Sequence, residues 1–168
     1  MVYAISPKYI LGAGLLLFLV VGFFIRKQNL VLVKAGAQYG YTAYNWKKTD
    51  RDELVRVWKN PPYTKAVRQI IGLDIIWMLI FGASIFYGLW LVVHRTSSSG
   101  NWVYVMGMIL IVAMVIIDGL QDASIYRHLV HGTTFDVRGL TTLKFSLLII
   151  SFLILTTGLI RYWRVVSV

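Results

Sequence analysis

The chain has 168 residues, of which 58% are hydrophobic and only 14% are charged, and its mean hydropathy is +0.69. A soluble domain of this length cannot bury so many apolar residues in one core, so the composition indicates an integral membrane protein. The sequence contains no cysteine, which excludes disulfides, thiolate catalysis, iron–sulfur clusters and cysteine-ligated zinc.

Four apolar runs predict membrane spans over about residues 9–25, 66–94, 102–126 and 141–161. Each is close to the ~20 residues that a helix needs to cross ~30 Å of hydrocarbon. The sequence therefore predicts an all-α membrane protein, a single domain in which four transmembrane helices form an antiparallel bundle. One lysine precedes the first run and no small-x-small cleavage site follows it, so we expect this run to remain in the membrane rather than to be cleaved as a signal peptide.

The basic residues are distributed unevenly between the two sides of this predicted bundle. Of the 17 Lys and Arg residues, 13 lie between residues 26 and 68 or between 127 and 144. The positive-inside rule therefore predicts that both termini lie outside the cytoplasm and that the loop 26–65 lies inside it. The same distribution indicates attraction to anionic lipid headgroups rather than binding of nucleic acid.

The long loop 26–65 is expected to have structure of its own. Residues 29–33 and 39–46 are β-prone, which predicts a short hairpin or an interfacial segment, with its tyrosines and Trp46 in the headgroup layer. The tyrosines are Tyr39, Tyr41 and Tyr44.

The sequence TDRDELVRVWKN, residues 49–60, predicts a short amphipathic helix. Asp50 is placed to cap it, Glu53 to reach back to the cap, and Trp58 to lie on the apolar side. Pro61 and Pro62 then end this helix and begin the next. The two later connections, RTSSSGNW and HGTTFDVRG, are short, so consecutive spans are expected to pack as antiparallel neighbours.

Several ionisable residues are predicted to lie at one depth. At ~1.5 Å per residue from Trp102, Asp118 lies ~24 Å across the membrane and Asp122 reaches its inner boundary. Asp74 lies one turn inside the same end of the second span, and Lys144 opens the fourth. Because charges in a membrane span are costly, these groups should face the bundle. The candidate ligand-binding residues are Asp74, Asp118, Gln121, Asp122 and Lys144.

Two interpretations of this cluster remain open at the level of sequence. It either clasps helices together, or it forms a cytoplasm-facing site for a cation, a proton or a lipid headgroup. His128 and His131 share no helical face with the two acids of their span. We therefore expect these histidines to lie at the headgroup surface, and we expect no bound metal or cofactor. Walker, Rossmann and HExxH motifs are absent from the sequence and no catalytic residues can be assigned, so the interpretation leans against an enzyme.

The order of the motifs DELVRVW, GLDIIWMLIFG, IIDGLQDASI and TTLKFSLLII resembles a group of small uncharacterised bacterial membrane proteins. In that group the second span opens with a Leu-Asp step, the third closes with Asp-x-x-Glu-Asn and the fourth opens with Leu-Lys. The resemblance covers most of the chain from about Asp50 and matches Asp74, Asp118 and Lys144, whereas Gln121 and Asp122 replace Glu-Asn. It implies a four-helix fold in a bacterial inner membrane and no particular activity.

Two functions follow as expectations. The first is a membrane protein that acts by association, as an accessory subunit or scaffold, with a membrane-protein partner or a second copy of itself. The alternative is a binding or transport protein that uses the cluster of Asp74, Asp118, Asp122 and Lys144.

Overall fold

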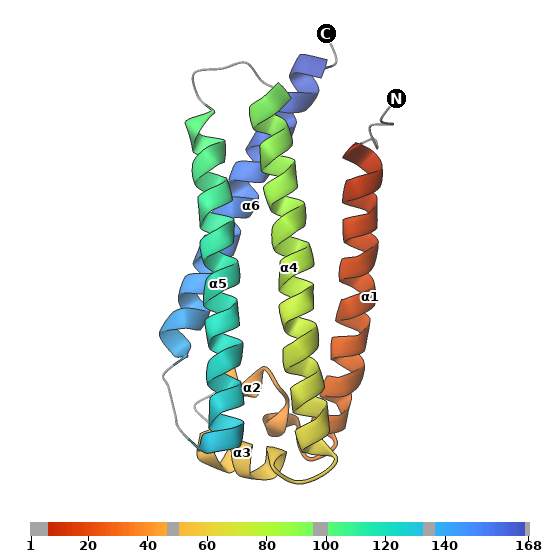
Figure 1. The fold of residues 1–168 in the computed structure, drawn as a ribbon, viewed down its shortest axis with the longest axis vertical. Helices are drawn as coiled ribbons and strands as arrows, with labels where there is room; N and C mark the ends of the chain where they lie inside the picture. Colours follow the sequence, from red (N-terminus) through yellow and green to blue (C-terminus); the bar gives the residue numbers. More distant parts are fainter. Residues whose placement is uncertain (1–6, 47–50, 96–100, 133–136, 167–168) are drawn as a thin grey trace.

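The computed structural model describes residues 7–46, 51–95, 101–132 and 137–166. Four long helices run side by side along the molecule, and three short elements lie together at one end (Figure 1). The long helices are α1 (Pro7–Val33), α4 (Tyr63–Arg95), α5 (Trp102–His131) and α6 (Arg138–Val166). The short elements are the 3-10 helix η1 (Ala37–Tyr39), α2 (Ala43–Trp46) and α3 (Arg51–Trp58). The described residues contain no strand, so the predicted all-α bundle is confirmed.

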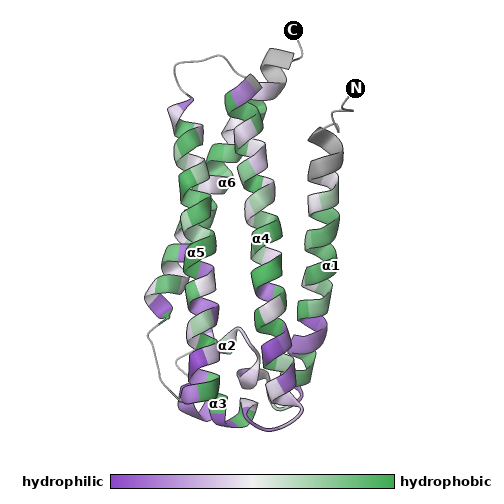
Figure 2. Cartoon of the chain, in the orientation of Figure 1, coloured by the Kyte–Doolittle hydropathy of each residue, from purple (hydrophilic) through white to green (hydrophobic). Residues whose placement is uncertain are grey.

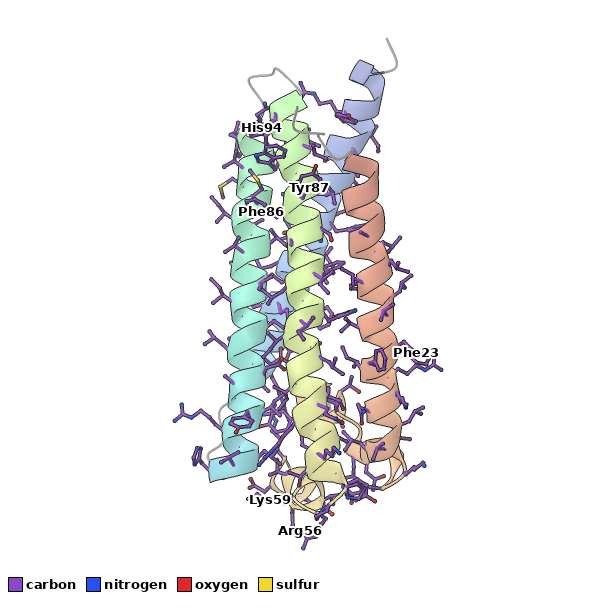
Figure 3. All side chains as sticks on the ribbon, turned by 45° about the vertical axis from the view of Figure 1, so that its right-hand side comes forward. Phe23, Arg56, Lys59, Phe86, Tyr87 and His94 are labelled. Carbon is purple, nitrogen blue, oxygen red and sulfur yellow. The ribbon has the colours of Figure 1, made fainter. Side chains whose placement is uncertain are left out.

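All four long helices are long and apolar enough to cross a membrane. The candidate spans are Gly12–Val33, Tyr63–His94, Trp102–His131 and Arg138–Tyr162. Apolar residues cover most of each helix, and hydrophilic residues gather where α2 and α3 lie (Figure 2). Phe23 is 66% exposed and points away from the bundle (Figure 3), as a lipid-facing side chain does. The chain is therefore an integral membrane protein.

Helix α4 lies between α1 and α5, and α6 packs mainly on α5 and to a smaller extent on α4. We call the end at which α1 begins and α6 finishes the terminal end, and the end that carries η1, α2 and α3 the loop end (Figure 1). The four helices alternate in direction. The antiparallel arrangement predicted from the short connections is thus present.

Small residues allow the membrane-spanning helices to approach closely. A Cβ atom at Gly158 would lie 2.8 Å from the ring of Tyr104, and one at Gly88 would lie 2.8 Å from Leu155. Large apolar residues fill the space around these glycines and form what we call the membrane core. It contains Met78, Ile85, Leu89, Val92, Tyr104, Ile111 and Met114.

The segment between α1 and α4 packs beneath the bundle and forms a second core, the loop-end core. Its largest buried members are Leu32, Tyr44, Leu54, Trp58, Val67, Ile70 and Ile125. The predicted hairpin of residues 29–33 and 39–46 is wrong, because residues 29–33 are the last turns of α1 and residues 43–46 form α2. Placement of the tyrosines in the headgroup layer is also wrong for Tyr41 and Tyr44, which are buried. Burial against α4 and α5 has overridden their β-propensity.

Helix α3 confirms the predicted amphipathic helix, with Leu54, Val55 and Trp58 buried. Asp50, the predicted cap, lies outside the described residues. Glu53 accepts a hydrogen bond from the Tyr39 hydroxyl at 3.3 Å. Its carboxylate therefore helps to hold η1 on α3.

We predict that Gly158→Ala lowers the melting temperature of the protein in detergent, because the added methyl group meets the buried ring of Tyr104. Overpacking of this kind costs about 1–3 kcal/mol. Gly119→Ala is the matched control, since nothing lies within 4 Å of its Cβ position. Tryptophan fluorescence during heating measures both. Equal melting temperatures for the two variants would contradict the packing of α6 on α5.

Candidate functional site

Three carboxylates and one ammonium group meet inside the bundle near the loop end. Asp74 on α4 and Asp118 and Asp122 on α5 each offer an oxygen, and these atoms lie within 4.8 Å of one another. We call these three residues the acid cluster. Lys144 on α6 donates a hydrogen bond to Oδ1 of Asp118. The structure therefore brings together four of the five candidate residues. Gln121 is also buried on α5, but its Oε1 atom has no hydrogen-bond partner among the described residues.

The ion pair between Lys144 and Asp118 joins α6 to α5 and is almost fully enclosed. The Asp118 side chain is 1% exposed and that of Lys144 is 10% exposed. Removing one partner of a buried pair leaves an uncompensated charge, which typically costs about 3–5 kcal/mol. The pair therefore constrains how the two helices pack.

Tyr41 reaches the acid cluster from the segment between η1 and α2. Its hydroxyl donates to Oδ1 of Asp122 at 2.7 Å, and both residues are buried. Burial, together with the neighbouring carboxylate of Asp122, raises the pKa of the Tyr41 hydroxyl well above its usual value. The hydroxyl therefore stays protonated and remains a donor to the cluster.

Contacts with α1 and α3 hold Tyr41 in this position. Its backbone N–H donates to Oδ1 of Asn29 on α1 at 2.8 Å. Its ring stacks on that of Trp58 with 6.0 Å between the centroids. The indole of Trp58 in turn donates to the carbonyl of Tyr39 at 2.7 Å. The loop segment thus places one hydroxyl group beneath the acids through contacts with two separate helices.

Each of the two acids on α5 has one oxygen held by a donor and one oxygen without a partner. Lys144 binds Oδ1 of Asp118 and Tyr41 binds Oδ1 of Asp122. The Oδ2 atoms of both are buried and accept no hydrogen bond from the described residues. A buried oxygen without a partner is costly, so these two atoms indicate a further binding partner.

A pocket of about 350 Å³ lies between α1 and α6 and reaches the acid cluster. We call it the α1–α6 pocket. Trp77, Phe145 and Ile25 provide apolar walls. Its polar lining comes from Arg26, Asn29, Tyr41, Thr42, Asn45, Asp74 and Lys144. Charges of both signs therefore face one cavity.

The pocket includes residues that sequence reasoning missed. Arg26 and Asn29 belong to α1, whose apolar run offered no charged group, and Asn45 belongs to the short helix α2. In the sequence, Arg26 contributes only to the distribution of charge that predicts the orientation. Oδ1 of Asn45 is buried without a hydrogen-bond partner among the described residues.

The expectation for His128 is wrong, because its side chain is buried rather than at the headgroup surface. Nδ1 lies 2.8 Å from the Tyr44 hydroxyl and Nε2 lies 2.9 Å from Oδ1 of Asp52. The tautomer with hydrogen on Nε2 satisfies both contacts. His131, by contrast, is exposed. Neither histidine belongs to the acid cluster.

A periodic signal in the sequence could have located His128. The buried residues of α5 include a series spaced by seven residues, consisting of Gly107, Met114, Gln121 and His128. Such spacing keeps one seam of a helix facing its neighbours.

The chain matches no protein-family model, no curated protein and no solved structure in the three comparisons made. The site therefore has to be interpreted from its own geometry.

We predict that Tyr41→Phe destabilises the protein by about 1–3 kcal/mol, because Asp122 loses its donor while remaining buried. Tyr126→Phe serves as the control, since this tyrosine is 43% exposed on the same helix as Asp122. Chemical unfolding in mixed micelles gives both free energies. A Tyr41 variant as stable as the Tyr126 variant would show that the hydroxyl does not support the cluster.

His128→Gln is expected to lower the melting temperature, because one side chain of that shape cannot satisfy both Tyr44 and Asp52. His131→Gln, one turn later and exposed, should leave it unchanged. Heating followed by tryptophan fluorescence compares the two. Equal losses in both variants would contradict the position of His128 between α2 and α3.

Proposed function

We propose that this protein binds the polar headgroup of a membrane lipid in the α1–α6 pocket. The observation that carries the proposal is the pocket itself, which combines Arg26, Asp74 and an apolar wall in one cavity between two membrane-spanning helices. Ligand sites are generally concave and mostly apolar with a few polar groups that fix orientation. The α1–α6 pocket has this character.

The depth of the pocket supports a ligand from the lipid bilayer. About 20 residues separate His94 from Asp74 along α4, and about the same number separate Trp102 from Asp122 along α5, which is the length that crosses the hydrocarbon layer. The pocket therefore lies where hydrocarbon gives way to headgroups. Helix α1 packs mainly on α4, and the principal partner of α6 is α5, so a lipid can approach between α1 and α6.

The lining supports a headgroup that carries a phosphate. Arg26 is exposed on α1 and makes no hydrogen bond or ion pair with another described residue. A guanidinium group is well suited to a phosphate because its donors match two of the oxygens. Oδ1 of Asn45, which has no hydrogen-bond partner among the described residues, can accept from a hydroxyl or ammonium group of the same headgroup. Trp77 and Phe145 supply apolar contact for the adjoining glycerol and acyl carbons.

We further propose that the loop end faces the cytoplasm and that the membrane is the bacterial inner membrane. The basic residues between 26 and 68 support this orientation through the positive-inside rule. Their charge would also attract anionic lipids to the mouth of the pocket.

Binding is tested with Arg26→Gln in nanodiscs that contain a mixture of phospholipid and diacylglycerol. The native protein should retain phospholipid in native mass spectrometry, and the variant should retain at least ~10-fold less, the change that corresponds to about 1.4 kcal/mol. Lys27→Gln is the matched control, because this neighbouring cation is exposed and does not line the pocket.

Three outcomes would contradict headgroup binding. The first is equal retention of phospholipid by Arg26→Gln and Lys27→Gln. The second is that the native protein retains diacylglycerol as readily as phospholipid. The third is that the native protein binds free glycerol phosphate as tightly as it binds phospholipid. A protein partner that co-purifies with both variants in place of lipid would favour the accessory-subunit function instead.

The orientation is tested by cysteine labelling, for which the cysteine-free chain is suited. Lys59 and His94 are exposed and lie at opposite ends of the molecule (Figure 3). A membrane-impermeant maleimide should label His94→Cys in intact cells and Lys59→Cys only after the membrane is opened. The reverse pattern would overturn the proposed orientation.

A further inference from the structure

We propose that the acid cluster binds one divalent cation through carboxylate oxygens of Asp74, Asp118 and Asp122. This site lies beside the α1–α6 pocket and does not depend on a lipid being the ligand of that pocket. The three oxygens lie within 4.8 Å of one another. Two oxygens bound to one Ca²⁺ ion can be up to ~5 Å apart, because each Ca²⁺–oxygen bond measures ~2.3–2.6 Å. Each pair of these oxygens is therefore close enough to bind the same ion.

The charges of the cluster favour a doubly charged ligand. Three carboxylates surround one point, and the single ammonium group of Lys144 is the cation paired with them. Two formal negative charges remain when all three acids are ionised, which one divalent cation neutralises. Carboxylates so close together repel each other strongly unless a cation or protons lie between them. All-oxygen ligands are the ones that Mg²⁺, Mn²⁺ and Ca²⁺ prefer.

The hydrogen bonds around the cluster leave ligand atoms available. Lys144 holds one oxygen of Asp118 and Tyr41 holds one oxygen of Asp122. The other oxygen of each is buried without a partner among the described residues. A donor that fixes one carboxylate oxygen and leaves the second free is the usual way in which neighbouring groups orient metal ligands. These two Oδ2 atoms are the observation that distinguishes the cluster from a simple group of acids.

Access to the proposed cation site runs through Asp74. Both α5 acids are fully buried, whereas Asp74 is half-buried and lines the α1–α6 pocket. Asp74 also makes no hydrogen bond or ion pair with another described residue, so its carboxylate can turn toward an ion. An ion held there would complete its coordination with water or with a phosphate oxygen in the pocket.

The structural alternative is a clasp in which the acids merely hold the helices together. The two interpretations are separated by the effect of Mn²⁺ on the melting temperature. Under the cation proposal, Mn²⁺ raises the melting temperature of the native protein above its value in EDTA, and it raises that of Asp74→Asn by less. Under the clasp no ion binds, so the native protein melts at the same temperature in Mn²⁺ and in EDTA.

The experiment uses the full-length protein in nanodiscs of neutral lipid, with Mn²⁺ as the probe. Electron paramagnetic resonance titration should show one bound Mn²⁺ per protein, with Ca²⁺ competing for it. Asp74→Asn should weaken Mn²⁺ binding by at least ~10-fold, since even the loss of a group that only orients a metal ligand costs 10–100-fold. Glu53→Gln is the control, because its carboxylate is exposed on α3 and lies outside the cluster.

Folding of each variant is checked by its helical circular dichroism, and Asp122→Asn serves as the second test if Asp74→Asn fails to fold. Loss of Mn²⁺ binding in a folded cluster variant, with binding retained by Glu53→Gln, supports the proposal. Absence of stoichiometric Mn²⁺ binding to the native protein overturns it, as does equal binding by the folded cluster variant. Lipid retention that depends on Arg26 would survive that result, so failure of the cation site is distinguishable from failure of headgroup binding.

Discussion

The ion pair between Lys144 and Asp118 is the constraint from which the rest of the loop end follows. A charge buried inside a membrane bundle must be compensated, and this pair compensates one of three neighbouring carboxylates. Asp122 and Asp74 then need other partners. Tyr41 supplies a donor to Asp122 from outside the bundle. The segment between α1 and α4 must therefore fold compactly beneath the helices to bring that hydroxyl to its place.

The loop-end core explains how the Tyr41 hydroxyl is brought to Asp122. The ring of Trp58 stacks on the rings of both Tyr41 and Tyr44. One of these tyrosines then contacts Asp122 and the other contacts His128, so a single aromatic stack fixes two polar contacts to α5. Because α1 packs chiefly on α4, a pocket remains beside the stack. The acid cluster and the α1–α6 pocket thus have Asp74 in common, and Lys144 contacts both.

The sequence was sufficient to predict the long helices and the depth of the ionisable residues. Length and apolarity determine a membrane span, and counting along the spans brought Asp74, Asp118, Asp122 and Lys144 to one level. The conformation of residues 29–46 was not predictable in the same way, because it depends on burial against α4 and α5 rather than on local propensity. Arg26 could not be identified as a pocket residue from the sequence, because the pocket depends on how far α1 lies from α6 in the fold. His128 could have been found, since it continues the buried series of Gly107, Met114 and Gln121.

The central claim is that the carboxylates around the Lys144 pair are arranged for a ligand and not only for packing. An anomalous-difference map from crystals of the native protein grown in lipid with Mn²⁺ tests this most directly. The account predicts one peak at ~2.2 Å from carboxylate oxygens of Asp74, Asp118 and Asp122, the distance typical of a small hard cation. A map without a peak there, in crystals whose Asp118 and Lys144 side chains are well ordered, would contradict it.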